Sequence, residues 1–187
     1  MIAWIILAVL GLVLIWLVLI YNGLVSIRND VQNAWKQIDV QLKRRHDLIP
    51  NLVSAVKGVM EFEQDTLEKV ISARAKAVSA GTPASRAESE NMLTQALGKL
   101  FAVMENYPAL KSNQNVMQLQ EELTSTENRI SFARQLYNDL VANYRTKIQV
   151  FPNNTVSSMF NFQPEEYFGA EETDRAVPGV NLSLRGK

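Results

Sequence analysis

The chain has 187 residues, equal numbers of basic and acidic side chains (19 each), and no cysteine. This length accommodates one domain with an ordinary core plus an anchor. The balanced charge gives no electrostatic basis for nucleic-acid binding, which depends on clustered Lys and Arg. The lack of cysteine excludes disulfides, thiolate chemistry and lipidated cysteines.

The first segment is apolar enough to cross a membrane. Every residue from Ile2 to Ile20 is apolar or glycine, and the first charged side chain is Arg28. A helix of this length spans the hydrocarbon core of about 30 Å, and Trp4 and Tyr21 lie near its ends, as interfacial aromatics do. We therefore predict a transmembrane anchor over residues 1–21. The alternative is a cleaved signal peptide, but the basic segment and the small-residue cleavage site that it requires are both missing.

Positive charge beside the anchor predicts its orientation. Arg28 and Lys36 follow the apolar run, and acidic neighbours count little in the positive-inside rule. We expect a single-pass protein of the cell (inner) membrane, with its N-terminus outside and its following domain in the cytoplasm.

Residues 22–151 have the apolar spacing of packed helices. Apolar residues recur in steps of three and four, which is typical of helices that pack at a shallow angle, and no long stretch alternates as a strand would. We predict an all-α fold in which the anchor is followed by an elongated antiparallel bundle of three to four long helices. The three seams are Val31, Ile38, Leu42, Ile49, Leu52, Val56 and Val59; Leu93, Leu97, Leu100, Met104 and Tyr107; and Val116, Leu119, Leu123, Thr126, Ile130, Ala133, Tyr137, Leu140 and Tyr144.

Breaking and capping residues mark the predicted helix ends. The first helix is expected to run to Gly81-Thr82-Pro83, and the next to Asn106-Tyr107-Pro108. The predicted caps are Ser85 with Glu88, as a capping box, and Asn115 with Gln118.

Pro50 interrupts the first predicted helix. Proline removes one helical hydrogen bond and clashes with the carbonyl four residues earlier, here that of His46. The apolar seam stays in phase across it, which favours a kink near Pro50 over a reversal of the chain. The reversal stays open as an alternative, with Asp47 capping a new helix.

The character of the chain changes after Pro152. Residues 152–168 carry the aromatic residues Phe160, Phe162, Tyr167 and Phe168 at irregular spacing, and residues 169–187 are polar and predicted to be disordered. The aromatic tail either folds back to cap the bundle or docks on another protein or on the membrane surface.

Three groups of charges are candidates for interaction or for helix register. Arg44 and Arg45 belong to a basic run about 35 Å beyond the anchor, too far for lipid headgroups on a straight helix. Inter-helix pairing, a partner surface or plain solvation are the remaining roles. Glu127 with Arg134, and Glu63 with Arg74 in the first helix, flank seams, where charges usually set register; a buried polar relay is the functional alternative.

No catalytic, cofactor or metal site can be assembled from the sequence. His46 is the single histidine, nothing in the spacing brings further ligands to it, and no glycine-rich phosphate loop follows a strand. We expect neither a cofactor nor enzyme activity.

Several motifs resemble those of the LemA family of bacterial membrane proteins. The longest is the stretch Trp35 to Val53, WKQIDVQLKRRHDLIPNLV. Further support comes from Tyr107 to Lys111, from Leu119 to Asn138 and from Phe151 to Asn154, ending at Tyr167-Phe168. The resemblance covers the anchor to about residue 168. Two local departures are Ala109, where the family pattern has Asp, and Arg145, where it has Asn.

The resemblance implies an anchored, elongated helical bundle with no established activity and no catalytic residues to transfer. Some members resemble proteins of membrane organelles, and others are encoded beside membrane zinc proteases. Our leading hypothesis is a non-enzymatic scaffold or adaptor that binds other proteins or itself at the lipid bilayer. The alternative is a signalling or regulatory module, acting with a membrane protease.

Overall fold

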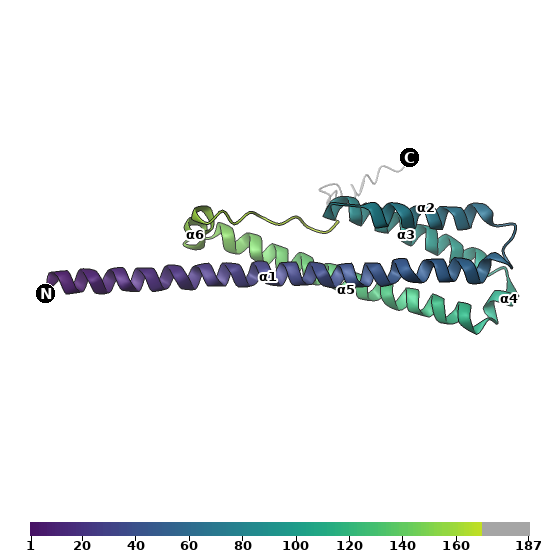
Figure 1. The fold of residues 1–187 in the computed structure, drawn as a ribbon, viewed down its shortest axis with the longest axis horizontal. Helices are drawn as coiled ribbons and strands as arrows, with labels where there is room; N and C mark the ends of the chain where they lie inside the picture. Colours follow the sequence, from purple (N-terminus) through teal and green to yellow (C-terminus); the bar gives the residue numbers. More distant parts are fainter. Residues whose placement is uncertain (170–187) are drawn as a thin grey trace, which may run out of the picture.

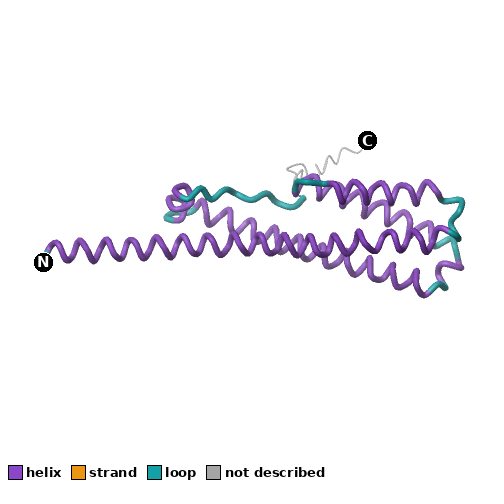
Figure 2. Tube along the Cα trace, viewed as in Figure 1, coloured by secondary structure: helices purple, strands orange, loops and turns teal. Residues whose placement is uncertain are grey.

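The computed structural model describes residues 1–169, and every regular element in this range is a helix (Figures 1 and 2). The all-α prediction is confirmed. The helices are α1 (Ile2–Lys57), α2 (Gln64–Ser79), α3 (Pro83–Met104), α4 (Pro108–Lys111), α5 (Gln114–Gln149) and α6 (Asn153–Met159).

Helix α1 joins the apolar N-terminal segment to the bundle without a break. It is 56 residues long, and its most apolar window has a mean hydropathy of 3.0 with none of its residues buried against the rest of the chain. Exposing so many large apolar side chains to water is unfavourable, whereas lipid solvates them. The first third of α1 therefore has the length, composition and exposure of a membrane-spanning helix.

The other described helices pack along α1 from the end of its apolar segment onward (Figure 1). Helix α5 lies antiparallel to α1, while α2 and α3 form a hairpin at the end of the bundle far from the N-terminus. The short α4 connects α3 to α5 at that same end, and α6 lies at the opposite end, beside the middle of α1. Short connections between long helices produce this antiparallel arrangement.

The chain reverses after Lys57, in a turn over residues 58–63 that begins eight residues beyond Pro50. Pro50 lies inside α1, so the alternative of a reversal at Pro50 is wrong, and so is the expectation that the first helix runs to Gly81. Met60 is completely buried while Val59 is half-exposed, so the seam loses its phase at the turn. The backbone N–H groups of Val59 and Met60 both bond to the Val56 carbonyl, which closes the last turn.

The caps of α3 and α5 lie earlier than predicted. Thr82, not Ser85, precedes α3: its hydroxyl accepts a bond from the Ser85 N–H, and the Ser85 hydroxyl accepts one from the Thr82 N–H. Pro83 then occupies the first helical position, where its missing N–H costs nothing. Asn113, not Asn115, caps α5: its side-chain oxygen accepts hydrogen bonds from the backbone N–H groups of Asn115 and Val116.

Two apolar cores follow each other along the bundle. The proximal core, nearer the anchor, is formed by α1 between Leu24 and Leu42 together with α5, α6 and the aromatic tail. The distal core lies between Ile49 and Leu123 and is formed by α1 with α2, α3, α4 and the start of α5. Charged residues occupy the layer between them.

Candidate functional site

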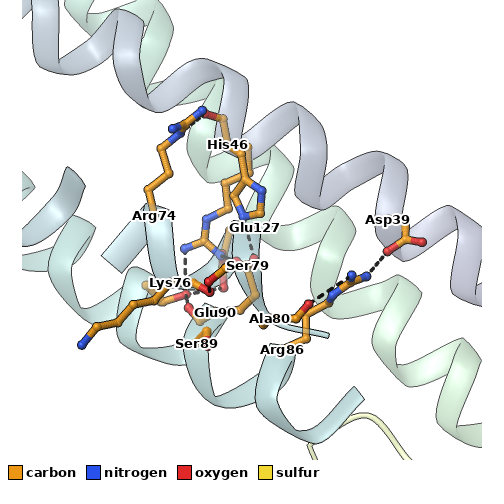
Figure 3. A network of polar contacts seen from close by, with 12 residues as sticks. Asp39, His46, Arg74, Lys76, Ser79, Ala80, Arg86, Ser89, Glu90 and Glu127 are labelled. Carbon is orange, nitrogen blue, oxygen red and sulfur yellow. Dashed lines mark hydrogen bonds and ion pairs between the residues drawn. The ribbon is translucent and has the colours of Figure 1, made fainter. Parts of the chain in front are cut away.

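The layer between the two cores is a buried polar cluster contributed by four helices (Figure 3). Arg45 of α1 donates to a Glu90 oxygen of α3 at 3.3 Å and to the Thr94 hydroxyl at 2.8 Å. Its guanidinium also lies 2.8 Å from a Glu127 carboxylate oxygen of α5. That last oxygen is not at a hydrogen-bonding angle, so the contact is an ion pair without a directed hydrogen bond.

The Arg45 and Glu90 side chains are almost completely buried. Buried ions lose several kcal/mol of hydration, which only close partners and further hydrogen bonds offset. Glu90 meets this requirement with both carboxylate oxygens, because its second oxygen lies 2.6 Å from His46 Nε2. With both oxygens engaged, the carboxylate is poorly placed to act as a base, and the geometry fits a device that sets the register of the helices.

Arg74 connects α2 to the same cluster. Its Nε donates to the backbone carbonyl of His46 at 2.7 Å. In a regular helix that carbonyl accepts from the residue four positions later, which here is Pro50 and has no N–H. Arg74 therefore satisfies the acceptor that Pro50 leaves free, and α1 passes Pro50 without an orphaned buried carbonyl. Arg74 lies in α2 and Glu63 at its start, so the expectation that both belong to the first helix is wrong.

Arg134 lies between the polar cluster and the tail. Burial lowers the pKa of its guanidinium, while the charges of Glu127 and Glu90 oppose that shift and the charge of Arg45 adds to it. The guanidinium stands 4.7 Å from the centre of the Phe168 ring, as a cation–π contact.

The aromatic tail lies against the bundle. Phe162 and Phe168 are buried in the proximal core, Tyr167 packs partly against it, and Phe160 is half-exposed. The tail backbone is held by polar side chains: Asn138 both accepts from the Phe168 N–H and donates to its carbonyl. These two bonds between one amide side chain and the backbone of one residue position the tail in one register.

Two tyrosines of α5 hold the tail at further points. The hydroxyl of Tyr137 donates to the Glu166 carbonyl at 2.8 Å, and that of Tyr144 donates to the Gln163 carbonyl at 3.0 Å. Burial raises the pKa of both phenols, and with the nearby charges of Glu165 and Glu166 it raises the pKa of Tyr137 to about 12.

Arg44 has a different position from its neighbour. It lies on the outside of the bundle, 3.5 Å from Glu122 of α5, and both side chains are well exposed. An exposed pair of this kind contributes little stability. Of the predicted register residues, Arg45 and Glu127 come together in the polar cluster. Arg134 lies between the cluster and the tail, against Phe168, and Arg44 lies on the outside of the bundle.

Sequence reasoning missed Glu90 as the acceptor. Continuing the three–four steps of the α3 seam backward from Leu97 and Leu93 places Glu90 in the seam, as the same steps place Arg45 between Leu42 and Ile49. Two oppositely charged residues in facing seams are the signal that predicts the pair. A second missed pair is Arg86 with Asp39, where the Arg86 guanidinium also lies 5.3 Å from the centre of the Trp35 ring.

These features define a class: an all-α bundle with a buried polar layer, held on an N-terminal helix of membrane-spanning length. The sequence profile of the LemA family matches residues 34–182, and the chain belongs to the LemA family. It is 27% identical over 155 residues to Protein LemA of Metamycoplasma hominis, across 82% of this chain and 71% of that protein.

The chain is also similar to magnetosome proteins. Magnetosome protein MamQ 2 of Paramagnetospirillum magneticum is 25% identical over 174 residues, across 79% of this chain and 64% of that protein. Magnetosome protein MamQ of Magnetospirillum gryphiswaldense is 24% identical over the same share of each chain. The match thus spans less than two thirds of the length of these magnetosome relatives.

Proposed function

We propose that this protein is a non-enzymatic, membrane-anchored scaffold or adaptor that presents the distal end of its bundle to a protein partner. The observation that carries the proposal is the continuity of α1 from anchor to distal core. The 36 residues of α1 beyond Tyr21 extend about 54 Å as a helix. A rod of this length, braced by α5, holds its far end at a defined distance from the bilayer.

The distal end carries an exposed apolar surface. Phe62, in the turn between α1 and α2, is 95% exposed, and Val59 and Ile71 beside it are also exposed. Phe62 and Ile71 line an open groove, together with the charged residues Lys57, Glu61 and Glu68 among others. Exposed aromatic groups within a charged rim are typical of protein contact sites.

The partner on this surface is either another protein, such as a membrane protease, or a second copy of the chain. The charges after the anchor favour a cytoplasmic position for the bundle in the cell membrane. A partner that binds the distal apolar surface would be held at a fixed distance from the inner leaflet.

Site-specific photo-crosslinking in cells tests the proposal. A photoreactive phenylalanine analogue replaces Phe62 in one variant and Phe132 in another; Phe132 is 73% exposed on α5 and is the matched control. We expect a reproducible protein adduct from position 62 that is weak or missing from position 132. Equal labelling at both positions, or none at 62, would contradict the distal docking site.

A regulatory module is the second candidate, and the joint at Pro50 supports it. The bond from Arg74 to the His46 carbonyl links α2 to the one turn of α1 that lacks a helical hydrogen bond. In this alternative, Pro50→Ala alters the cellular output while the protein stays folded and inserted. An unchanged phenotype would count against it.

A further inference from the structure

The corner between α5 and α6 carries a second exposed apolar group. Phe151 is 82% exposed, Met159 62% and Phe160 53%, and Val150 is exposed beside them. The corner is compact, since the Asn154 N–H donates to the Val150 carbonyl and the Ser157 hydroxyl to the Ile148 carbonyl. We refer to these four exposed side chains together as the α5–α6 apolar corner.

This corner lies beside the end of the membrane-spanning segment (Figure 1). The ring of Phe160 is 4.7 Å from that of Tyr21, the first residue after the uninterrupted apolar run. Leu17 and Ile20, within the last turn of the run, pack against the proximal core to which α6 contributes. Since Phe160 lies against Tyr21 and the end of the apolar run packs against the proximal core, the corner is at the depth where hydrocarbon gives way to headgroups.

Two basic residues lie near the corner, on the side of the bundle away from the N-terminus of α1. Lys147 is exposed in the last turn of α5, and the Arg28 guanidinium lies over the Phe162 ring at 5.2 Å. Exposed aromatic side chains with Lys and Arg behind them are the pattern of segments that lie in a membrane interface.

We propose that Val150, Phe151, Met159 and Phe160 insert into the interface of the same leaflet from which α1 emerges. The inference rests on α1 spanning the bilayer and is independent of the protein partner at the distal end. The occupant of the corner is lipid, because the corner is continuous with the lipid-covered part of α1. A second contact besides α1 prevents rotation of the bundle about the α1 axis and so orients it on the membrane.

Depth measurement in proteoliposomes tests the proposal. The chain has no cysteine, so single cysteines introduce one environment-sensitive fluorophore each. Full-length Phe151→Cys is labelled and compared with Phe62→Cys and Phe132→Cys as exposed control positions, and with Leu10→Cys as the membrane reference. The vesicles contain phosphatidylcholine and phosphatidylglycerol, with or without lipids that carry a nitroxide near the headgroup.

The expected result is a blue-shifted emission at position 151 and quenching by the nitroxide lipids. Aqueous iodide should quench the label there at least about threefold less than at 62 or 132, since interfacial side chains lie about 5–10 Å deep. A label at 151 that is as accessible to iodide as the label at 62 would overturn the inference. If the emission of the label at position 10 is not shifted to the blue and aqueous iodide quenches it, the spanning premise fails as well.

A second copy of the chain is the competing cover for this corner. In that case the emission at 151 would shift to the blue only at high protein-to-lipid ratio and would resist the nitroxide lipids. That outcome would also overturn lipid insertion. Circular dichroism of each labelled variant checks that the helices are intact.

Discussion

Arg45 and Glu90 are charged residues in seam positions that apolar side chains usually occupy. Each is separated by three or four residues from apolar neighbours that belong to the two cores. A buried ion pair gives little net stability compared with an apolar pair. It does specify helix alignment, because every alignment that separates the two partners leaves a buried charge unpaired.

Removing one partner is expected to be costly. Glu90→Ala leaves Arg45 with the half-exposed Glu127 and leaves His46 without its carboxylate, so we expect a loss of about 3 kcal/mol in the free energy of unfolding. Denaturant unfolding in detergent measures it. The control is Glu122→Ala, which removes the exposed partner of Arg44 and should cost less than about 1 kcal/mol. Equal effects would show that the buried layer has no special role.

Tyr137 predicts a dependence of stability on alkaline pH. Its pKa is raised from 10.0 to about 12 by burial and by the charges of Glu165 and Glu166. Below pH 10 the phenol is neutral in both states. Between pH 10 and 12 the unfolded state ionises first, so the stability of the fold should fall with rising pH, by up to about 2–3 kcal/mol from this residue.

Unfolding of the wild type and of Tyr137→Phe at pH 9, 10 and 11 measures this contribution. The variant lacks the hydroxyl bond to the Glu166 carbonyl, so it is expected to be less stable at pH 9, with a shallower decline above pH 10. The difference between the two proteins should therefore shrink as the pH rises. Parallel pH profiles would contradict the assignment of the shift to Tyr137.

At the scale of elements, the helix boundaries depend on single residues. α1 continues past Pro50 because another helix supplies the missing donor, and it ends at Lys57, where Met60 rather than Val59 enters the core. Thr82 starts α3 because its hydroxyl and that of Ser85 each accept a backbone N–H of the other residue. The predicted box with Ser85 and Glu88 had the right motif type but began three residues late.

Coupling between Pro50 and Arg74 tests how α1 continues. Arg74→Ala leaves the His46 carbonyl without a donor and should cost about 2 kcal/mol. In a Pro50→Ala background the alanine N–H is available to that carbonyl, so the same change should cost about 1 kcal/mol less. A double-mutant cycle by denaturant unfolding gives the coupling. Lys69→Ala, at an exposed site on the same helix, should be additive with Pro50→Ala; additivity of Arg74→Ala too would exclude the link.

At the scale of the whole molecule, α1 contributes to the anchor, to both cores and to the polar cluster. It contains the anchor, one wall of each core and the Arg45 charge between them. The polar layer divides the bundle into a proximal half closed by the aromatic tail and a distal half closed by the α2–α3 hairpin. The proposed lipid contact belongs to the proximal half and the proposed protein contact to the distal half.

The sequence by itself determined the all-α class, the apolar segment of spanning length and most of the core. These follow from local properties: an apolar run matches the bilayer thickness, and steps of three and four place side chains on one helix face. Leu93, Leu97 and Leu100 of the predicted α3 seam, for example, are all buried. The same steps also place Arg45 and Glu90 in the seams of their helices, next to apolar core residues.

Only the tertiary structure decided where the chain turns, which helices pair and where the tail lies. The turn at residues 58–63 follows from the hairpin that α2 makes with α3, and no spacing within α1 indicates it. The place of the tail depends on Asn138, Tyr137 and Tyr144, whose polar atoms meet backbone groups 19 to 30 residues away. Contacts between residues so far apart in the chain leave no periodic signal, because each depends on the packing of elements that the local pattern describes one at a time.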